Sequence, residues 1–383
     1  MQISASLKED VWHNLRDAGS YEWWYFDAQD ESETYSFVAI WYSGFPFSPY
    51  YLKRYNDWQK HGSEQPFPLE HAAFSFNFYE NGKEVINFIK EGDAPLFAAS
   101  TKAPFARFEK NEFFYDHAHN RFTLRLDFDM PLRRKTVKAE LHFSVRPIDS
   151  SVDLASLSSG AGAHSWVLAS PSNSVSGDFE IFDGSKTERV SFNGRGYHDH
   201  NFGRVPMSAD IHSWYWGRAH SRDLDLVYYT ISYKDQAKEP FSFLLLTRQD
   251  RVLAAEHRLN TVERAQAGLL FTPRYATRLC LSNARVHFAA EQVKILDTGP
   301  FYLRFNSEFD LLLDGARFQM SGISEFLHPE RINSSLVLNL IKSKIWREDE
   351  WSVMYTLYNF FNRLWELGTK RNELAVRQAS VHK

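Results

Sequence analysis

The chain has 383 residues, of which 43% are hydrophobic and 24% charged, and its formal net charge is −4. This length exceeds what one hydrophobic core usually serves, so two packed units are expected, with a single large β assembly as the alternative. The composition is that of a globular protein, and its slightly acidic charge provides no concentrated basic surface for nucleic acid.

The N-terminal residues predict a cytoplasmic protein. Lys8, Glu9 and Asp10 stand where a secretory signal peptide needs an apolar core. No stretch of the sequence approaches the length of a transmembrane helix. Cys280 is the single cysteine, so an intrachain disulfide cannot form and nothing in the sequence demands an oxidising compartment.

The aromatic segment from Tyr21 to Ala28 is the first candidate site element. Aromatic residues make up 16% of the chain, and their flat faces suit a cavity for a conjugated or cationic guest, although β proteins also use them as ordinary strand formers. On a strand, one face would carry Glu22, Trp24 and Phe26, and the other Trp23 and Tyr25. Glu22 would then lie among rings, where desolvation raises its pKa, or it would pair with an arginine at a strand edge.

Alternating hydrophobic residues predict antiparallel β-structure through most of the chain. The clearest alternation covers residues 122–130 and, after a turn at 131–135, residues 139–145, which predicts a hairpin. Similar alternation recurs around 73–78, 179–182, 226–233 and 301–313, with turn sequences at Asn81-Gly82, Asp183-Gly184 and Asp314-Gly315. Many short strands without helical crossovers indicate a barrel or a sandwich. The Ser/Gly-rich residues 150–165 are expected to connect strands or to form a loop over a cavity.

A polar segment bounded by glycines, Gly194 to Gly203, is the second candidate site element. It contains His198, Asp199, His200 and Asn201 in a row, and such a run is costly to order unless the side chains form a network. Asp199 beside the two histidines is a candidate acid/base group. The alternative is a buried turn in which the Asp and the Asn cap backbone amides.

The same segment raises the question of a metal. His198 and His200 share a strand face and, with His212 or His220, offer ligands. No cysteine and no clear second carboxylate stand at ligand spacing, so no metal is expected. The chain also has no phosphate-binding glycine loop, and no cofactor is expected.

After Pro329 the hydrophobic period changes from two to about 3.6, which predicts a C-terminal helix. One stripe of this helix holds Trp351, Met354, Tyr355, Tyr358, Phe361 and Trp365, and it is widened by Val353, Leu357, Phe360 and Leu364. Packing across the β-structure is the favoured interpretation of this stripe. Dimerisation and contact with a membrane surface are the alternatives.

Together, the two clusters resemble the carotenoid 1,2-hydratase family, the hydroxyneurosporene synthases. The N-terminal match consists of Trp23, Trp24, Tyr25, Asp27 and Ala28, followed by Phe47, Ser48, Pro49, Tyr50 and Tyr51. The central match consists of Gly196, Tyr197, Asp199, His200, Asn201, Gly203 and Pro206, then Trp214, Trp216, Arg218 and Ala219. A third match consists of Gly322, Ser324, Glu325, Leu327 and Arg331. The matches span residues 19–347, nearly the whole chain.

The resemblance implies a mainly β fold with two lipocalin-like antiparallel β-barrel or sandwich units and a C-terminal helix. The expected units are an N-terminal domain over residues 1–205, a C-terminal domain over 206–345 and the helix over 346–383. The implied reaction adds water across a terminal alkene of an apolar polyene or isoprenoid without a cofactor. Such a site needs an acid kept neutral until use, rings that stabilise a carbocation, and a placed water.

The resemblance assigns roles to residues of both clusters. Asp199 is the expected acid, with His200 holding it or activating water. The expected catalytic residues are Asp199, His200, Tyr228 and His198. The expected substrate-binding residues are Glu22, Trp24, Tyr50, Asn201, Trp214, Trp216 and Tyr229.

One departure from the family keeps other functions open. In the hydratases a Tyr and an Asp follow the Trp-rich segment on the next strand, whereas here that strand reads Leu226, Val227, Tyr228, Tyr229 and Thr230, without the carboxylate. A cyclase or pericyclase, which would act mainly by positioning its substrate, is therefore an alternative, since related folds serve natural-product Diels-Alderases. A lipid carrier is the third hypothesis, which the polar residues 199–201 disfavour.

Overall fold

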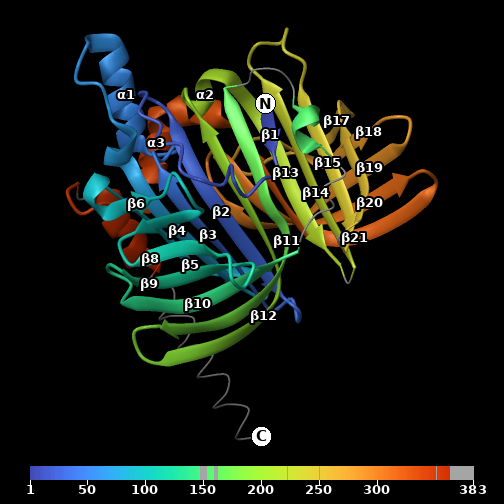
Figure 1. Cartoon of the computed structure of the whole chain (residues 1–383). Helices are drawn as coiled ribbons and strands as arrows, with labels where there is room; N and C mark the ends of the chain where they lie inside the picture. The colour runs from blue at the N-terminus through green and yellow to red at the C-terminus, as the bar shows by residue number, and fades with distance from the viewer. Residues whose placement is uncertain (147–152, 159–162, 222, 250, 351, 363–383) are drawn as a thin grey trace, which may run out of the picture.

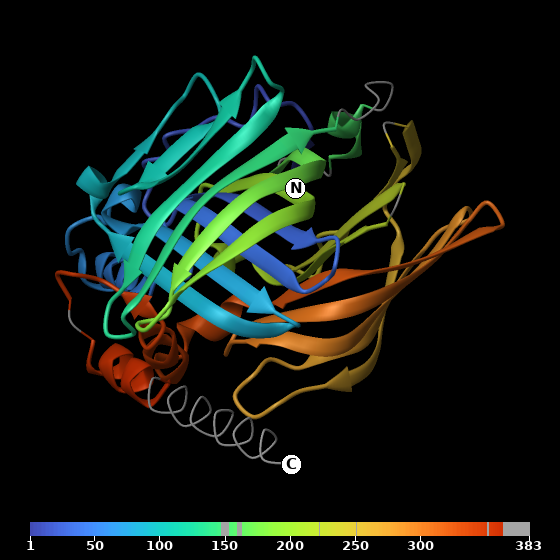
Figure 2. The same cartoon turned by 90° about the horizontal axis from the view of Figure 1, so that it is seen from below.

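Two large β-sheets make up most of the molecule (Figures 1 and 2). The computed structural model describes residues 1–146, 153–158, 163–221, 223–249, 251–350 and 352–362. Sheet A contains β1 (Gln2–Ser4), β2 (Tyr21–Asp30), β3 (Tyr35–Ser43), β4 (Ala72–Glu80), β5 (Lys83–Gly92), β6 (Phe97–Ala99), β7 (Phe105–Phe108), β8 (Asn111–Asp116), β9 (Arg121–Met130), β10 (Lys135–Val145), β11 (His164–Phe182), β12 (Thr187–Gly203) and β22 (Ile345–Trp346). Sheet B contains β13 (Ile211–His220), β14 (Leu224–Tyr233), β15 (Phe241–Arg248), β16 (Arg251–His257), β17 (Asn260–Ala267), β18 (Tyr275–Ser282), β19 (Val286–Thr298), β20 (Tyr302–Leu313) and β21 (Ala316–Leu327).

Each sheet curls into a half-barrel, and the two lie side by side (Figure 2). The order in sheet A is β22-β5-β4-β3-β2-β12-β11-β10-β9-β8-β7-β6, with β1 added to β11 in parallel. The order in sheet B is β16-β15-β14-β13-β21-β20-β19-β18-β17. The mainly β fold class with two antiparallel units is therefore confirmed, as is the predicted β9–β10 hairpin.

The three predicted turns join neighbouring strands. Asn81-Gly82, with φ angles of 52° and 66°, connects β4 to β5, and Asp314-Gly315, with 47° and 85°, connects β20 to β21. Two consecutive residues with positive φ form the turn whose twist matches that of a β-hairpin, and Asn, Asp and Gly tolerate this conformation best. Asp183-Gly184 lies between the long strands β11 and β12.

The two sheets enclose three hydrophobic cores, one inside each half-barrel and one between the sheets. Strand β2 serves two of them because its side chains alternate. Trp24 and Phe26 point into the half-barrel of sheet A, whereas Trp23 and Tyr25 belong to the core between the sheets. The predicted division of the β2 side chains into two faces is confirmed.

Helices connect the strands: α1 (Pro49–His61), α2 (Met207–Asp210) and α3 (Ser335–Lys342), with 3₁₀ turns η1 (Pro68–His71), η2 (Ala94–Leu96), η3 (Leu154–Leu157) and η4 (Pro329–Asn333). Helix α1 begins at Ser48, whose hydroxyl accepts hydrogen bonds from the backbone N–H groups of Tyr50 and Tyr51, and it ends at Gly62 with a φ of 64°. No helix in the described part of the chain has both the length and the apolarity needed to cross a membrane.

After sheet B the chain returns to sheet A. Helix α3 leads into β22, which pairs in parallel with β5, and the guanidinium of Arg347 donates to the buried carboxylate of Glu91 at 2.9 Å. Sheet A thus draws on residues 2–203 and 345–346, and sheet B on residues 211–327. The expected unit boundaries at residues 205 and 345 stay a prediction.

The predicted C-terminal helix is described over residues 353–362. Tyr355 is buried and packs against Trp346 with ring centroids 5.3 Å apart. Five other apolar side chains of this helix are exposed: Val353, Met354, Leu357, Phe360 and Phe361. The expected packing of the stripe therefore holds for Tyr355 and not for these five. Trp351, Leu364 and Trp365 lie outside the described residues, as do 147–152 and 159–162 of the region predicted to contain a long loop.

Candidate active site

A small cavity lies between the two sheets. Its walls are formed by Trp23, Tyr25, Asp199, Asn201, Trp214, Trp216, Tyr229 and Glu325, and it encloses about 40 Å³. Five of these eight residues are aromatic, and two are acidic. The cavity therefore combines rings with titratable groups, as expected for acid chemistry on an apolar molecule.

Strand register explains why these residues meet. Across β2 and β12, Tyr25 pairs with Asp199 and Trp23 pairs with Asn201, so these four side chains share the face of sheet A that looks toward sheet B. From sheet B, Trp216 pairs with Tyr229 on β14 and with Glu325 on β21. Each wall of the cavity is thus a patch on a regular strand, which holds its side chains rigidly.

Asp199 accepts three hydrogen bonds at the wall of the cavity. Trp166 Nε1 and the Tyr197 hydroxyl each donate to Oδ2 at 2.7 Å, and Asn201 Nδ2 donates to Oδ1 at 2.9 Å. All three donors are neutral. Burial therefore dominates and raises the pKa of Asp199 to about 7, with Glu325 and Asp27 adding negative potential. A large share of the Asp199 carboxyl groups is protonated at neutral pH.

Glu325 is a second carboxylate in the same cavity, with a charged partner. Arg304 Nη1 donates to Glu325 Oε1 at 2.7 Å, and the Tyr25 hydroxyl lies 3.2 Å from the same oxygen. Burial raises the pKa of Glu325, and the Arg304 guanidinium opposes that rise. The sequence interpretation included Glu325 in a family match without giving it a role, and its spacing from Trp216 in the chain gives no sign of their pairing.

A network of buried charges supports this end of the cavity. Asp27 on β2 receives Arg218 Nε at 2.6 Å, and the Tyr25 hydroxyl donates to its other oxygen at 2.7 Å. Arg304 Nη2 lies 3.5 Å from Asp27. Arg218 and Arg304 belong to sheet B, so these contacts join the two sheets through charge-assisted hydrogen bonds.

A buried histidine that the sequence interpretation did not single out lies beside the cavity. His164 bonds the Tyr21 hydroxyl through Nδ1 at 2.9 Å and the Tyr229 hydroxyl through Nε2 at 3.2 Å. Burial lowers the pKa of His164 to about 3, so the ring is neutral. His164 therefore orients the Tyr229 ring and adds no charge to the cavity.

The structure corrects the predicted partnership between Asp199 and the neighbouring histidines. The glycine-bounded segment forms no turn, because β12 runs through it to Gly203 as a regular strand. Side chains alternate along a strand, so His198 and His200 point into the half-barrel of sheet A, away from Asp199. His200 is therefore in no position to hold Asp199.

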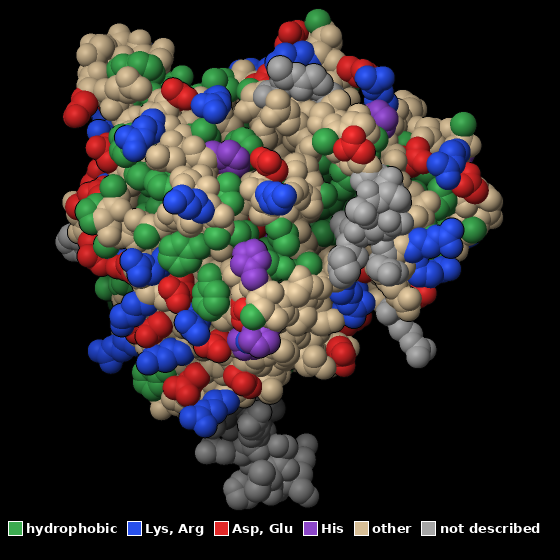
Figure 3. Space-filling model, in the orientation of Figure 1, with side chains coloured by type: hydrophobic (Ala, Val, Ile, Leu, Met, Phe, Trp, Pro, Cys, Tyr) green, Lys and Arg blue, Asp and Glu red, His purple; other side chains and the backbone are tan. Residues whose placement is uncertain are grey.

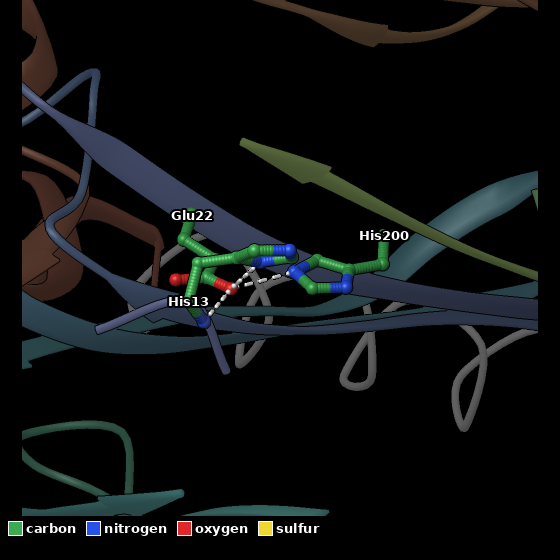
Figure 4. Close-up of side chains that lie close together, drawn as sticks. All are labelled: His13, Glu22 and His200. Carbon is green, nitrogen blue, oxygen red and sulfur yellow. Dashed lines mark hydrogen bonds and ion pairs between the residues drawn. The ribbon is translucent and has the colours of Figure 1, made fainter. Parts of the chain in front are cut away.

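Glu22 and Trp24 lie on the same far side of β12 as His200. Trp24 stacks on the His200 ring with centroids 4.5 Å apart, in the core of the half-barrel. Glu22 Oε1 receives three hydrogen bonds, from the backbone N–H and Nδ1 of His13 and from Nε2 of His200, at 2.8 to 2.9 Å (Figure 4). Neither side chain lines the cavity between the sheets, so the expected substrate contacts of Glu22 and Trp24 stay a prediction, whereas the alternative of an arginine partner for Glu22 is wrong.

The cluster of His13, Glu22 and His200 has donor atoms within 4.8 Å of one another, a spacing at which metals are held. Burial alone would lower the pKa of His200, but its hydrogen bonds to Asp10 and Glu22 outweigh burial and raise it to about 9. A protonated imidazole between two carboxylates offsets one of their two negative charges without an ion. We therefore interpret it as a hydrogen-bonded network that ties residues 10–13 to sheet A.

Two further predicted residues lie apart from the cavity. Tyr228 points into the half-barrel of sheet B and donates to Ser324 Oγ at 2.9 Å, while its neighbour Tyr229 lines the cavity. Tyr50 belongs to the core between the sheets, where the Lys342 ammonium lies 4.9 Å from its ring. His212 and His220 contact Glu330 and Asp225 and do not join His198.

A larger hollow lies elsewhere, over β1 and β11. It encloses about 410 Å³ and is lined by Ile3, Ser165, Val167, Phe202 and six other residues. Glu9 is the one titratable residue in its lining. We assign the chemistry to the smaller cavity because acid groups and rings converge there.

Comparison with known proteins gives a family and a fold. The model of the carotenoid hydratase CrtC family matches residues 128–354. A protein of Chlorobaculum tepidum named hydroxyneurosporene dehydrogenase is 41% identical over 377 residues, which cover 96% of this chain and 97% of that protein. The acyclic carotenoid 1,2-hydratase of Thiocapsa roseopersicina is 24% identical over 204 residues, which cover 53% of this chain and 45% of that protein.

Two solved structures have a fold similar to that of this chain. CghA in complex with Sch210972 has a TM-score of 0.58 at 13% identity, covering 81% of this chain and 89% of that chain. An AttH protein from Nitrosomonas europaea has a TM-score of 0.55 at 14% identity, covering 84% and 95%. At such low identities the likeness shows the fold alone, and it agrees with the expected pair of lipocalin-like units.

Proposed function

This chain belongs to the carotenoid hydratase CrtC family, and from that premise we propose that it adds water to a terminal trisubstituted alkene of an acyclic carotenoid. Asp199 is the acid that protonates the alkene. The observation that carries this proposal is a buried carboxyl group whose pKa of about 7 leaves about half of it protonated at neutral pH, within a cavity walled by five aromatic rings.

The chemistry needs both features at once. Protonation of a trisubstituted alkene at its less substituted carbon produces a tertiary carbocation, so the donor must be a neutral acid held against the double bond. The faces of Trp23, Trp214 and Trp216 offer negative potential to that cation, and a dry cavity strengthens this attraction. Water then attacks the cation and leaves a tertiary alcohol.

The volume of the cavity limits which part of the substrate reacts. About 40 Å³ accommodates a water molecule and not the end of a polyene. The ring side chains therefore have to move when the substrate enters, and only its terminal isoprene unit is expected to reach Asp199. The rest of the chain then lies outside the cavity.

The experiment compares products by mass after incubation of the purified chain with an acyclic carotenoid in ¹⁸O-labelled water. Hydration predicts a product heavier by one water that carries the label, and Asp199→Asn lowers its formation by at least about 10³-fold. Dehydrogenation, the activity in the name of the Chlorobaculum relative, removes two hydrogens instead. An isomer of unchanged mass indicates a cyclase, and unchanged substrate that stays bound indicates a carrier.

The proposal extends to where the protein meets its substrate. An acyclic carotenoid is insoluble in water and resides in lipid bilayers, so a cytoplasmic hydratase has to take it from a membrane surface. The exposed apolar residues of the helix over 353–362 offer the contact.

On the face seen in Figure 3, Lys and Arg side chains are interspersed with Asp and Glu, so no patch of one charge marks another partner there.

A further inference from the structure

We infer that Glu325 is the second carboxylate of the reaction and takes a proton from the attacking water. This inference rests on the proposed function, because it assigns the second proton transfer of the same hydration. It also separates the reaction into two steps that different residues control.

The two carboxylates reach the cavity from different sheets. Asp199 stands on β12 of sheet A, and Glu325 stands on β21 of sheet B, where it pairs with Trp216. A molecule bound between the sheets therefore has an acid group on either side. This arrangement suits hydration, in which a proton from one group and a water deprotonated by another add to neighbouring carbons.

Their hydrogen-bond partners suit opposite roles. Asp199 contacts the neutral donors Trp166, Tyr197 and Asn201, whereas Glu325 receives the guanidinium of Arg304 at 2.7 Å. Burial raises the pKa of both carboxyl groups, but only Glu325 has a guanidinium that opposes this rise and favours the ionised form. When two carboxyl groups in one site have environments this different, the neutral one serves as the acid and the ionised one as the base.

The cavity also offers groups that would hold the water. Asn201 Oδ1 and Trp216 Nε1 are buried without a hydrogen-bond partner among the described residues, and both residues line the cavity. One of these atoms accepts and the other donates, so each offers a hydrogen bond to a water in the cavity. The cavity of about 40 Å³ has room for it, beside the carboxylate of Glu325.

The two steps conserve atoms and charge. The Asp199 carboxyl transfers its proton to the alkene carbon that carries hydrogen; a C–H bond forms from the π electrons, and the neighbouring carbon becomes a tertiary cation. The water oxygen donates an electron pair to that cation, and its proton passes to the Glu325 carboxylate. Exchange with solvent returns this proton to Asp199, so the net reaction joins one alkene and one water into one tertiary alcohol.

The test separates protonation from the addition of water. Wild type, Glu325→Gln and Asp199→Asn are each incubated with an acyclic carotenoid in D₂O, and both the product and the recovered substrate are analysed by mass. Without its base, Glu325→Gln still deuterates the alkene reversibly, because the cation loses a hydrogen from a neighbouring carbon to Asp199. We expect hydration by Glu325→Gln to fall at least about 100-fold while deuterium accumulates in the recovered substrate. Asp199→Asn should show neither.

Matched variants keep the result interpretable. Glu308→Gln removes an exposed carboxylate from the neighbouring strand β20 and should behave as wild type. Glu325→Asp retains a base and should recover part of the hydration lost in Glu325→Gln, which a merely structural defect would not do. Hydration by Glu325→Gln at the wild-type rate overturns the inference, and so does loss of both exchange and hydration in this variant while Glu325→Asp is no better. A wild-type chain that hydrates nothing overturns the proposed function itself.

Discussion

At the scale of single residues, the proposed hydration depends on the protonation of Asp199. Its pKa, raised to about 7 by burial, places the competent acid form below neutral pH. Hydration under conditions of limiting substrate should therefore fall about tenfold for each pH unit above 7, and it should also fall at acidic pH, where Glu325 becomes protonated. A pH–rate profile of kcat/KM checks this. A rate that rises through pH 7 would instead identify Asp199 as a base.

Folding stability should report the same carboxyl group. An Asp whose pKa is raised in the folded state contributes stability that is complete below its ordinary pKa near 4, and this contribution is lost as pH rises through about 7. Asp199→Asn removes this pH-dependent loss of stability, because Asn does not ionise. The Asn side chain retains an acceptor for Trp166 and Tyr197, and the Asn201 amide can turn its unpaired oxygen toward the new NH₂ group. The melting temperature of the variant relative to that of wild type should therefore rise between pH 5 and pH 8. If the difference in melting temperature between variant and wild type is the same at pH 5 and pH 8, that result would contradict the raised pKa of Asp199.

Sequence reasoning found part of the candidate site at this scale. Asp199, Asn201, Trp214, Trp216 and Tyr229 were singled out and do line one cavity. His198, His200, Glu22 and Trp24 lie on the opposite face of their strands, and Tyr228 points away from the cavity that Tyr229 lines. The strand rule that side chains alternate would have separated Asp199 from both histidines, but the flanking glycines suggested a turn. Glu325 and His164 could not be assigned, because their contacts with the cavity depend on pairing between strands far apart in the sequence.

At the scale of elements, the helix over 353–362 makes a testable contact. When the exposed apolar side chains of this helix enter the interface of a bilayer, their apolar area is buried, and this burial favours membrane binding. Replacing both Phe360 and Phe361 by Ser should lower co-sedimentation with phospholipid vesicles several-fold. Hydration of a detergent-dispersed substrate should stay unchanged.

The control for this experiment removes exposed apolar side chains elsewhere. Leu269 and Leu270 are exposed in the connection between β17 and β18, so a double Ser variant there tests whether any apolar loss weakens binding. Equal loss of vesicle binding in both double variants would contradict a contact specific to the helix.

Element positions were largely predictable, because each rests on a local pattern. The alternation of hydrophobic and polar residues predicted the β9–β10 hairpin and the division of β2 into two faces. The Asn-Gly and Asp-Gly pairs predicted the turns in which they lie. The degree of packing of the C-terminal helix was not predictable in this way. A wide apolar stripe shows that a helix has a face to cover, and it does not say whether the protein covers it.

At the scale of the whole molecule, the two sheets are expected to unfold together. They share the core between them, and Asp27 of sheet A binds Arg218 of sheet B at 2.6 Å while both side chains are buried. Removing one partner from a buried ion pair leaves an uncompensated charge, which costs roughly 3 to 5 kcal/mol. Asp27→Asn should therefore lower the melting temperature by several degrees and keep a single calorimetric transition.

An exposed pair supplies the comparison. Asp310 and Arg317 form an ion pair on the surface of sheet B, and Asp310→Asn should change the melting temperature little. Two separate transitions in wild type would show that the sheets fold independently and would remove the basis for a site that depends on both.

The overall fold was predictable from the resemblance more than from first principles. Alternating strands indicated a barrel or a sandwich, and the family likeness supplied the pair of curled sheets. Neither gave the buried network of Asp27, Arg218, Arg304 and Glu325, because it assembles only when both sheets are in place. The order of strands within each sheet likewise depends on long-range pairing that local patterns do not encode.

The most direct measurement is the infrared spectrum of the Asp199 carboxyl group. The difference between wild type and Asp199→Asn should contain the C=O stretch of a protonated carboxylic acid at pH 6, and this band should disappear with a midpoint near pH 7 as the carboxylate band replaces it. A difference spectrum with only the carboxylate band down to pH 5 would show that Asp199 is ionised where the enzyme needs an acid. That result would contradict the account.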